Sequence, residues 1–178
     1  LTRRPGVCAS SSGVAVANAL TGVMNAWFDH SPMLYISGTA ASDTLGIGAF
    51  QDSPHVDMAK PTTKLSLSID HPTRVLQILD LAWQTARSVP QGPVHLQFPM
   101  DIQSAEVDEA DLIHPVAQSA APITQPIPYL QQIARALLEA KRPLIIAGSE
   151  VYYAGEGQSL VNLVEAFAIP VQTPICDR

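Results

Sequence analysis

Short apolar runs alternate with helical segments along this chain, and that alternation constrains the fold more than any other feature. Apolar runs occupy residues 7–10, 32–38, 63–69 and 92–99, and helical patterns lie at residues 14–28 and from His71 to about residue 86. Strands joined by helices or long loops require crossover connections, which give a parallel sheet with helices on both faces. The sequence therefore predicts an α/β fold with a mainly parallel sheet.

The two helical segments carry apolar side chains at the spacing that puts them on one face of a helix. Ser12 directly precedes the first segment and is predicted to be its N-cap. The expected buried faces are Val16, Leu20, Val23, Met24 and Trp27 in the first helix, and Val75, Ile78, Leu79, Ala82 and Ala86 in the second.

A change in the sequence pattern after residue 103 indicates a second domain. From Gln103 to Gln125 the periodicity stops, and Pro115 and Pro122 interrupt the segment, which is typical of a linker. A helix face at residues 127–138, a buried strand at 142–148, a glycine-containing loop, a helix at 158–168 and a strand at 170–173 then follow. We therefore expect a first domain at residues 1–103, a linker at 104–125 and a second α/β domain at 126–178.

Composition excludes several classes of function. The formal net charge is −6 and no basic cluster is present, which argues against nucleic-acid binding. No apolar run reaches the roughly 18 residues that a membrane span needs. Cys8 and Cys176 lie too far apart in sequence for a metal or redox pair, so we expect each to be a buried thiol. The five histidines show no metal spacing, and core or solvated roles are expected for them: His30, His55, His71, His95 and His114.

Loops that follow the predicted strands are the candidate binding sites, because ligands bind at the carboxyl ends of parallel strands. The segment "SSSGVAVAN" follows the first strand, and its Asn18 can hold either a ligand or a neighbouring loop. The long loop after the second strand carries Phe50 and Gln51 side by side. The loop "GSEVYYAGEG" lacks the G-x-G-x-x-G spacing of a dinucleotide site. From the residues alone, the chain is part of a nucleotide-binding-like α/β protein.

Several segments, in their order along the chain, resemble the thiamine-diphosphate-dependent group of acetolactate synthase and benzaldehyde lyase. They are "PGVCASSSGVAVANALTGVMNAWFDHSPMLYISG", "FQD", "PTTK", "GPVHLQFPMDIQ", "KRPLIIAG" and "AIPVQTPICDR". The sequence departs from the group where Val14 and Ala15 replace Pro and Gly of a G-P-G turn, and where Asp52 replaces Glu. These departures favour a lyase or carboligase relative over a strict biosynthetic acetolactate synthase.

The resemblance implies a function and a set of site residues. Residues 1–103 would form the later part of the pyrimidine-binding domain, and residues 126–178 the start of the central domain. The parent enzyme would form or cleave a C–C bond next to the carbonyl of a 2-oxo acid or aldehyde. By motif position, Phe50 and Gln51 are the expected catalytic residues, and the expected cofactor-binding residues are Ser11, Gly13, Val14 and Asn18.

The resemblance also implies cofactors and partners. Thiamine diphosphate is the expected cofactor, with Mg²⁺ held by a domain outside this chain and the catalytic Glu upstream of Leu1. FAD is an open alternative for the central domain. A cytoplasmic homodimer or homotetramer with the active site between subunits is expected, and the 178-residue chain alone should be inactive. The alternatives are a non-catalytic nucleotide- or flavin-binding relative and an oxalyl-CoA decarboxylase-like enzyme.

Overall fold

The computed structural model describes residues 4–115 and 126–174, which fall into two compact units. The first unit contains four strands and four α-helices, with short 3₁₀ turns between them. Its strands are β1 Gly6–Ser10, β2 Met33–Thr39, β3 Ser66–Ser68 and β4 Pro93–Pro99. Its helices are α1 Val14–Phe28, α2 His55–Ala59, α3 Val75–Arg87 and α4 Met100–Ser104. Its 3₁₀ turns are η1 Ser42–Thr44, η2 Lys60–Thr62, η3 Pro72–Arg74 and η4 Glu109–Asp111.

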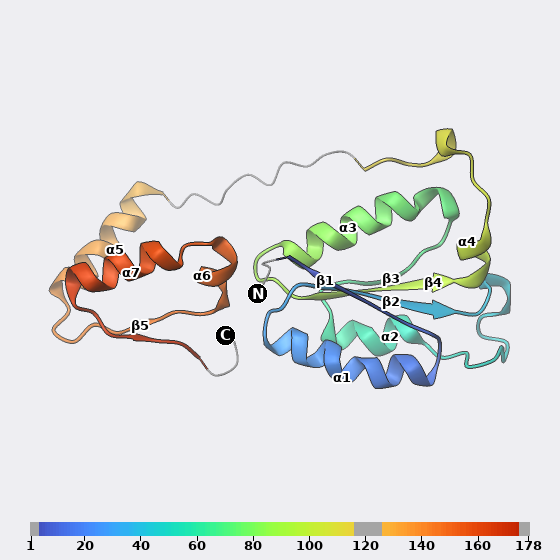
Figure 1. Cartoon of the computed structure of the whole chain (residues 1–178), viewed down its shortest axis with the longest axis horizontal. Coiled ribbons are helices and arrows are strands. Elements are labelled where there is room, and N and C mark those ends of the chain that lie inside the picture. The colour runs from blue at the N-terminus through green and yellow to red at the C-terminus, as the bar shows by residue number, and fades with distance from the viewer. Residues whose placement is uncertain (1–3, 116–125, 175–178) are drawn as a thin grey trace. The chain divides into compact units, whose positions relative to one another are not determined.

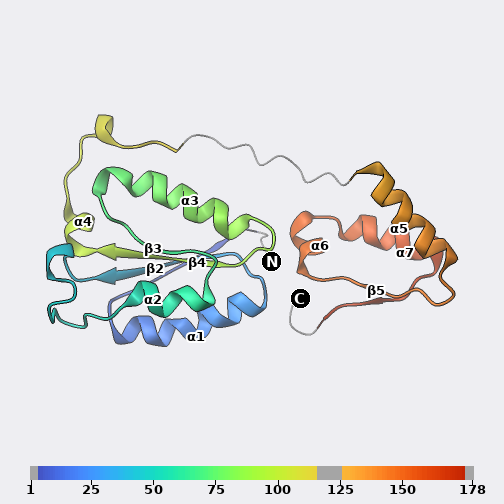
Figure 2. The same ribbon diagram turned by 180° about the vertical axis from the view of Figure 1, so that it is seen from behind.

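The four strands form one parallel sheet in the order β1-β2-β4-β3. Helix α3 covers one face of this sheet, and α1 and α2 lie on the other, as Figure 1 and the reverse view in Figure 2 show. The prediction of a parallel sheet with helices on both faces is confirmed. Strand β4 lies between β2 and β3. Because all the strands are parallel, the carboxyl ends of β1, β2 and β4 lie at the same end of the sheet.

The face of the sheet under α3 is apolar. Because side chains alternate along a strand, the even-numbered residues of β2 and β4 face α3. Among them, Leu34, Val94 and Leu96 are buried against the helix. The helix contributes Ile78, Ala82 and Ala86, all from the predicted face. This layer is the main hydrophobic core of the unit, and truncating a buried leucine in such a layer typically costs about 2–5 kcal/mol.

The opposite face, under α1 and α2, is partly polar. The odd-numbered residues Tyr35, Ser37, His95 and Gln97 are all buried there. Ser37 of β2 lies directly beside Gln97 of β4 in the register of the sheet. Val16 and Val23 of α1 pack on Tyr35 in a smaller apolar cluster. Buried polar groups must find hydrogen-bond partners, so this face carries interactions that the apolar face does not need.

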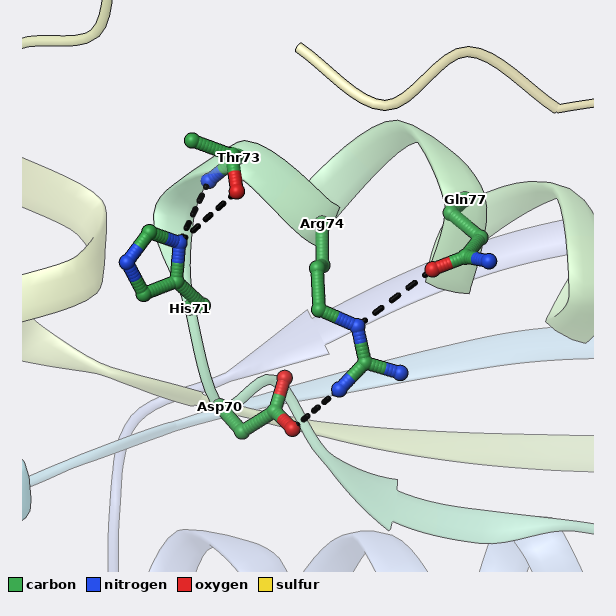
Figure 3. A network of polar contacts seen from close by, with 5 residues as sticks. All are labelled: Asp70, His71, Thr73, Arg74 and Gln77. Carbon is green, nitrogen blue, oxygen red and sulfur yellow. Dashed lines mark hydrogen bonds and ion pairs between the residues drawn. The ribbon is translucent and has the colours of Figure 1, made fainter. Parts of the chain in front are cut away.

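Polar contacts fix the start of α3. The 3₁₀ turn η3 directly precedes α3 and leads into it. His71 caps that turn, because its Nδ1 accepts the Thr73 N–H at 3.3 Å and lies 2.8 Å from Thr73 Oγ1. Arg74 forms an ion pair with Asp70 and donates from Nε to Gln77 Oε1 at 3.3 Å (Figure 3). His71 therefore has a structural role at this helix terminus.

The end of α3 is held by Lys64. Its Nζ donates to the carbonyl oxygens of Thr85 at 2.7 Å and Ser88 at 2.5 Å, and to Ser88 Oγ at 2.6 Å. A cation at a helix C-terminus satisfies carbonyl groups that have no partner within the helix and interacts favourably with the helix dipole. The lysine of the "PTTK" segment thus joins the start of β3 to the end of α3.

Several local predictions for the first unit are wrong. Helix α1 has Gly13 as its N-cap, with no side-chain capping bond, and Ser12 Oγ instead approaches Gln51. On α1, Met24 and Trp27 belong to the exposed residues, whereas Val16 and Val23 are buried as predicted. Cys8 is exposed, because it lies on β1, which is an edge strand of the described sheet. Cys176 lies outside the described residues.

The second unit contains a two-stranded parallel sheet and three helices. The predicted strand at residues 142–148 is reduced to two residues. Ile146 is 68% exposed, because within the described residues β5 pairs with one strand, β6. Residues of the predicted glycine-containing loop form a short helix, α6. The elements of the second unit are α5 Ile127–Glu139, β5 Ile145–Ile146, α6 Ser149–Ala154, α7 Gly157–Phe167 and β6 Val171–Gln172.

The segment between the two units was predicted to be a linker at residues 104–125. Its first part belongs to the first unit, which continues through Pro115. The Ile113 N–H donates to the carbonyl of Thr73 at 2.9 Å and so ties this segment to the start of α3. Residues 116–125 lie outside the described residues. None of the helices in the described ranges is both long and apolar enough to cross a membrane.

Candidate functional site

The turn between β1 and α1 contains a glycine that no other residue can replace without strain. Gly13 has φ +61°, a conformation that side chains other than glycine rarely adopt. A Cβ atom added to Gly13 would lie 2.5 Å from Cβ of Gln51 and 3.1 Å from the Gln51 carbonyl oxygen. The Gly13 turn and the Gln51 loop are therefore in direct contact, although 38 positions separate them in sequence.

Gln51 is itself held in an unusual conformation. Its φ is +55°, which is uncommon for a residue with a side chain. Ser12 Oγ donates to Gln51 Oε1 at 3.5 Å. The adjacent Asp52 accepts the Gly46 N–H at 2.6 Å and so closes the loop that presents Gln51. A side chain fixed by its backbone and its neighbours in this way can serve as a positioned hydrogen-bonding group.

A cavity of about 310 Å³ opens beside this contact. It is lined by three of the predicted site residues, namely Gly13, Val14 and Gln51, together with Ser53 and Met58. Ser53 Oγ is buried and has no hydrogen-bond partner among residues 4–115 and 126–174. An uncompensated buried hydroxyl at the wall of a cavity is suited to a ligand that carries its own polar atoms.

A second cavity, of about 400 Å³, lies at the carboxyl ends of β1, β2 and β4. Ser11, Thr39, Phe98 and Gln103 are among its lining residues. Thr39 Oγ1 is buried there, and the described part of the chain offers it no hydrogen-bond partner. The structure thus separates Ser11 from the residues that line the cavity beside Gln51.

Two predicted site residues line neither cavity. Asn18 is exposed on α1, one turn beyond Val14. Phe50 is 86% exposed and precedes Gln51 in the loop. Their proposed roles as a cofactor ligand and a catalytic wall are untested by the geometry of this chain and stay predictions.

Two histidines that the sequence analysis treated as scattered are brought together beneath this site. His55 and His95 are both fully buried, on α2 and β4. His55 Nε2 accepts the Gly13 N–H at 3.0 Å, and its Nδ1 lies 3.4 Å from Ser37 Oγ. The same Ser37 Oγ lies 2.8 Å from Nε2 of His95, whose Nδ1 lies 2.8 Å from Ser66 Oγ. We call this chain of four side chains the histidine relay.

Burial sets the charge state of the relay. Desolvation, and to a smaller extent the nearby His55, lower the pKa of His95 from 6.5 to about 4. Desolvation also lowers the pKa of His55, and Asp52 opposes that effect in part. Both imidazoles are therefore neutral at pH 7. Tyr35 lies over His95 with a ring-centroid distance of 5.2 Å, and burial raises the pKa of its phenol.

The site has no arrangement suited to holding a metal by itself. Within residues 4–115 and 126–174, no three His, Cys, Asp or Glu side chains are grouped closely enough to bind an ion. The side chains that line the cavity beside Gln51 are mostly apolar, amide or hydroxyl groups, and Asp52 is already engaged with Gly46. The arrangement is suited to orienting an organic ligand through uncharged hydrogen bonds and apolar contact.

Comparison with known proteins identifies the family. The model described as "Thiamine pyrophosphate enzyme, N-terminal TPP binding domain" matches residues 1–59, a range that includes the Gly13 turn, Gln51 and His55. The model described as "Thiamine pyrophosphate enzyme, central domain" matches residues 130–176. The chain belongs to the thiamine pyrophosphate enzyme family. The predicted resemblance is confirmed at that level.

Relatives within this family carry the names of several enzymes. The chain is 30% identical over 178 residues to a probable acetolactate synthase large subunit of Methanocaldococcus jannaschii, covering 97% of the chain and 30% of the relative. It is 32% identical over 174 residues to 2-hydroxyacyl-CoA lyase 1 of Dictyostelium discoideum, covering 96% and 30%. It is 32% identical over 170 residues to glyoxylate carboligase of Escherichia coli O157:H7, covering 93% and 28%. The chain thus spans about a third or less of the length of these relatives.

Proposed function

We propose that this chain is part of a thiamine-diphosphate-dependent enzyme that forms or cleaves a C–C bond next to the carbonyl of a 2-oxo acid or aldehyde. The observation that carries the proposal is the match of the TPP-binding domain model across the Gly13 turn and the Gln51 loop, two segments that lie in contact beside a cavity. The names of the relatives, which include a synthase, a lyase and a carboligase, support this reaction class without selecting one reaction.

The residues around the cavity fit part of such a cofactor. Gly13 offers backbone without a side chain, Val14 offers an apolar wall, and Ser53 Oγ is a buried hydroxyl that needs a partner. When bound, thiamine diphosphate supplies the carbon nucleophile that adds to the substrate carbonyl. Gln51 would orient the substrate and stabilise developing charge through its side-chain amide. Phe50 would exclude water from the reacting atoms in the assembled enzyme.

Ser11 and Asn18, which do not line this cavity, also have proposed roles. Ser11 would contact the cofactor from the second cavity, which it lines together with Thr39. Thr39 Oγ1 is buried there and has no hydrogen-bond partner in the part of the chain that the structure describes. Asn18 is exposed on α1 and would meet the cofactor or an adjacent loop only in the complete protein. Residues 1–103 would belong to the pyrimidine-binding domain and residues 126–178 to the central domain, with residues 104–125 between them.

The remaining parts of the proposal concern the complete protein. Mg²⁺ would be held by a domain outside residues 1–178, since the described residues contain no grouped ligands for it. FAD could bind through the central domain, so its release on denaturation should be measured. We further propose a homodimer or homotetramer that works in the cytoplasm, with the candidate site completed by a second subunit.

The test uses the full-length protein that contains this chain. It is purified and incubated with thiamine diphosphate and Mg²⁺, and then with pyruvate, glyoxylate or a 2-hydroxyacyl-CoA in separate reactions. Formation of acetolactate, tartronate semialdehyde or an aldehyde, dependent on thiamine diphosphate, would support the proposal and select the reaction. Binding of FAD or ADP without any turnover would favour the non-catalytic alternative instead.

A further inference from the structure

The histidine relay is buried next to the candidate site, yet neither His55 nor His95 lines the cavity beside Gln51. Two imidazoles and two hydroxyl groups occupy the polar face of the sheet, where apolar side chains would pack without any hydrogen-bonding requirement. Such a network is stabilising only when every donor meets an acceptor. The directions of its hydrogen bonds therefore indicate what the relay does.

The directions follow first from the Gly13 end. A backbone N–H can only donate, so Nε2 of His55 must be unprotonated to accept it. A neutral imidazole then carries its single proton on Nδ1, which donates to Ser37 Oγ. The hydroxyl proton of Ser37 is left to donate to Nε2 of His95. Each step is forced by the one before it.

The other end of the relay gives the same directions independently. Ser66 Oγ donates to the carbonyl of Val56 at 2.9 Å, so it can only accept from Nδ1 of His95. Nε2 of His95 is then unprotonated and accepts from Ser37. Because both ends agree, the relay has one consistent arrangement, in which both imidazoles are neutral and protonated on Nδ1.

This arrangement bears directly on Gln51. The bond from Gly13 to His55 fixes the backbone of the turn, and the same turn is in tight contact with Cβ of Gln51. Gln51 has a strained positive φ that its surroundings must maintain. His55 is also only four residues after Gln51. A movement of α2 would therefore displace Gln51 as well as the imidazole that holds Gly13.

We propose that His55 is a positioning residue for the candidate site, because its Nε2 holds the Gly13 turn against Gln51. Ser37, His95 and Ser66 act through His55 by fixing its tautomer, so that an acceptor always faces the Gly13 N–H. The positioning itself rests on the structure of this chain, whereas its effect on turnover rests on the proposed function.

The charges around His55 favour a neutral imidazole at pH 7, so that its Nε2 can accept a hydrogen bond. Desolvation lowers the pKa of His55, His95 faces it through Ser37, and Asp52 is the charged group that opposes the effect. Tyr35 lies beside His95 on the same face of the sheet. Protonation of His55 would place a donor against the Gly13 N–H and release the turn. We therefore expect the turn to loosen in acid and to stay fixed at neutral pH.

The test compares two substitutions of His55 in the full-length protein. His55→Gln can place an amide oxygen near the position of Nε2, and so keeps an acceptor for Gly13, whereas His55→Leu removes it. Hydrogen–deuterium exchange at single-residue resolution follows the Gly13 amide, with His114→Gln at an exposed histidine as control. We expect exchange at Gly13 to be about tenfold faster or more in His55→Leu, and near the wild-type rate in His55→Gln and His114→Gln. Equal exchange in His55→Leu and the wild type would overturn the proposal.

Three further measurements separate positioning from general damage. Thermal melts followed by circular dichroism show whether each full-length variant is folded, and exchange is compared only at temperatures where it is. Ser37→Ala should speed exchange at Gly13 by a smaller factor, because His55 loses the partner that fixes its tautomer; no change would overturn the role of the relay. In a protein with confirmed turnover, His55→Leu should lower kcat about tenfold with little change in KM, and His55→Gln should restore it.

The outcomes distinguish the two proposals. Loss of Gly13 protection with unchanged kcat would overturn positioning for the reaction. Absence of any turnover dependent on thiamine diphosphate in the wild type would refute the proposed function, and the exchange data would still decide whether His55 holds the turn.

Discussion

Acid should destabilise the first unit through His95, and the structure gives the size of the effect. His95 is fully buried between α1, α2 and the sheet, and its Nε2 and Nδ1 are both engaged with serine hydroxyls. The folded protein therefore resists protonation of this imidazole, whereas the unfolded chain takes up a proton at the ordinary pKa of 6.5. Between these two pKa values, the unfolded state binds more protons than the folded state.

The sign and magnitude follow from that difference. Because the unfolded state binds the extra proton, the free energy of unfolding falls as pH falls below 6.5 and levels off near the folded pKa of about 4. The full difference corresponds to about 3 kcal/mol, at about 1.4 kcal/mol for each pKa unit. Between pH 7.5 and pH 4.5, His95 alone should remove roughly 2–3 kcal/mol of stability. The lowered pKa of His55 acts in the same direction.

Urea denaturation at a series of pH values measures this effect. Both tryptophans of the chain, Trp27 and Trp83, lie in the first unit, so their fluorescence reports on that unit. Asp101 has its pKa held below 3.8 by hydrogen bonds from Ser42, so its contribution appears at lower pH than the range used. The comparison proteins are His95→Gln, which removes the titrating group, and His114→Gln, which replaces an exposed histidine.

We expect the stability of wild type and His114→Gln to fall in parallel with acid, and that of His95→Gln to fall much less. The relevant quantity is the change with pH, because Gln at position 95 can alter stability equally at every pH. If wild-type stability were the same at pH 7.5 and pH 4.5, or if His95→Gln kept the wild-type dependence, the neutral buried relay would be refuted.

Three substitutions test other parts of the structure. Gln51→Ala in the full-length protein should lower kcat by on the order of 10²–10³ if its amide stabilises developing charge; the exposed Gln84→Ala serves as control, and an unchanged kcat would exclude a catalytic role. Gly13→Ala should destabilise the first unit by at least about 1–3 kcal/mol from backbone strain, with a further cost from the clash with Gln51, as measured by urea denaturation; a variant as stable as wild type would contradict the close packing of the turn. Lys64→Met should lower stability by about 1 kcal/mol because it removes the cation at the end of α3, whereas the exposed Lys60→Met should have little effect.

The architecture of the first unit was accessible from sequence because its signals are local. The apolar run at residues 32–38 and the helical spacing of Ile78, Ala82 and Ala86 each depend on neighbours within a few residues. The short helix α2 was missed, since five residues are too few to show a helical period. In the second unit, the apolar run at 142–148 predicted a buried strand, but a sheet of two strands cannot bury it.

The candidate site was accessible only in part. Gly13, Val14 and Gln51 were predicted from motif position, and the structure brings them to one cavity. The relay was missed because His55 and His95 are 40 positions apart and their hydrogen-bonded link runs through Ser37 of β2. One signal was present. In "PVHLQF" a polar residue alternates with apolar ones, which indicates that one face of a buried strand is polar and must have partners there.

The strand order has a consequence for how the unit is synthesised. Strand β4 is the last of the four to leave the ribosome, yet it lies between β2 and β3, and β3 pairs with no other strand in the described unit. A nascent chain that ends before Pro93 therefore lacks the centre of its sheet and exposes apolar side chains meant for the core. Stalled chains ending at residue 92 should be cut by protease as quickly as an unfolded peptide. Resistance should appear only after β4 has emerged, so folding of this unit waits for nearly all of its sequence.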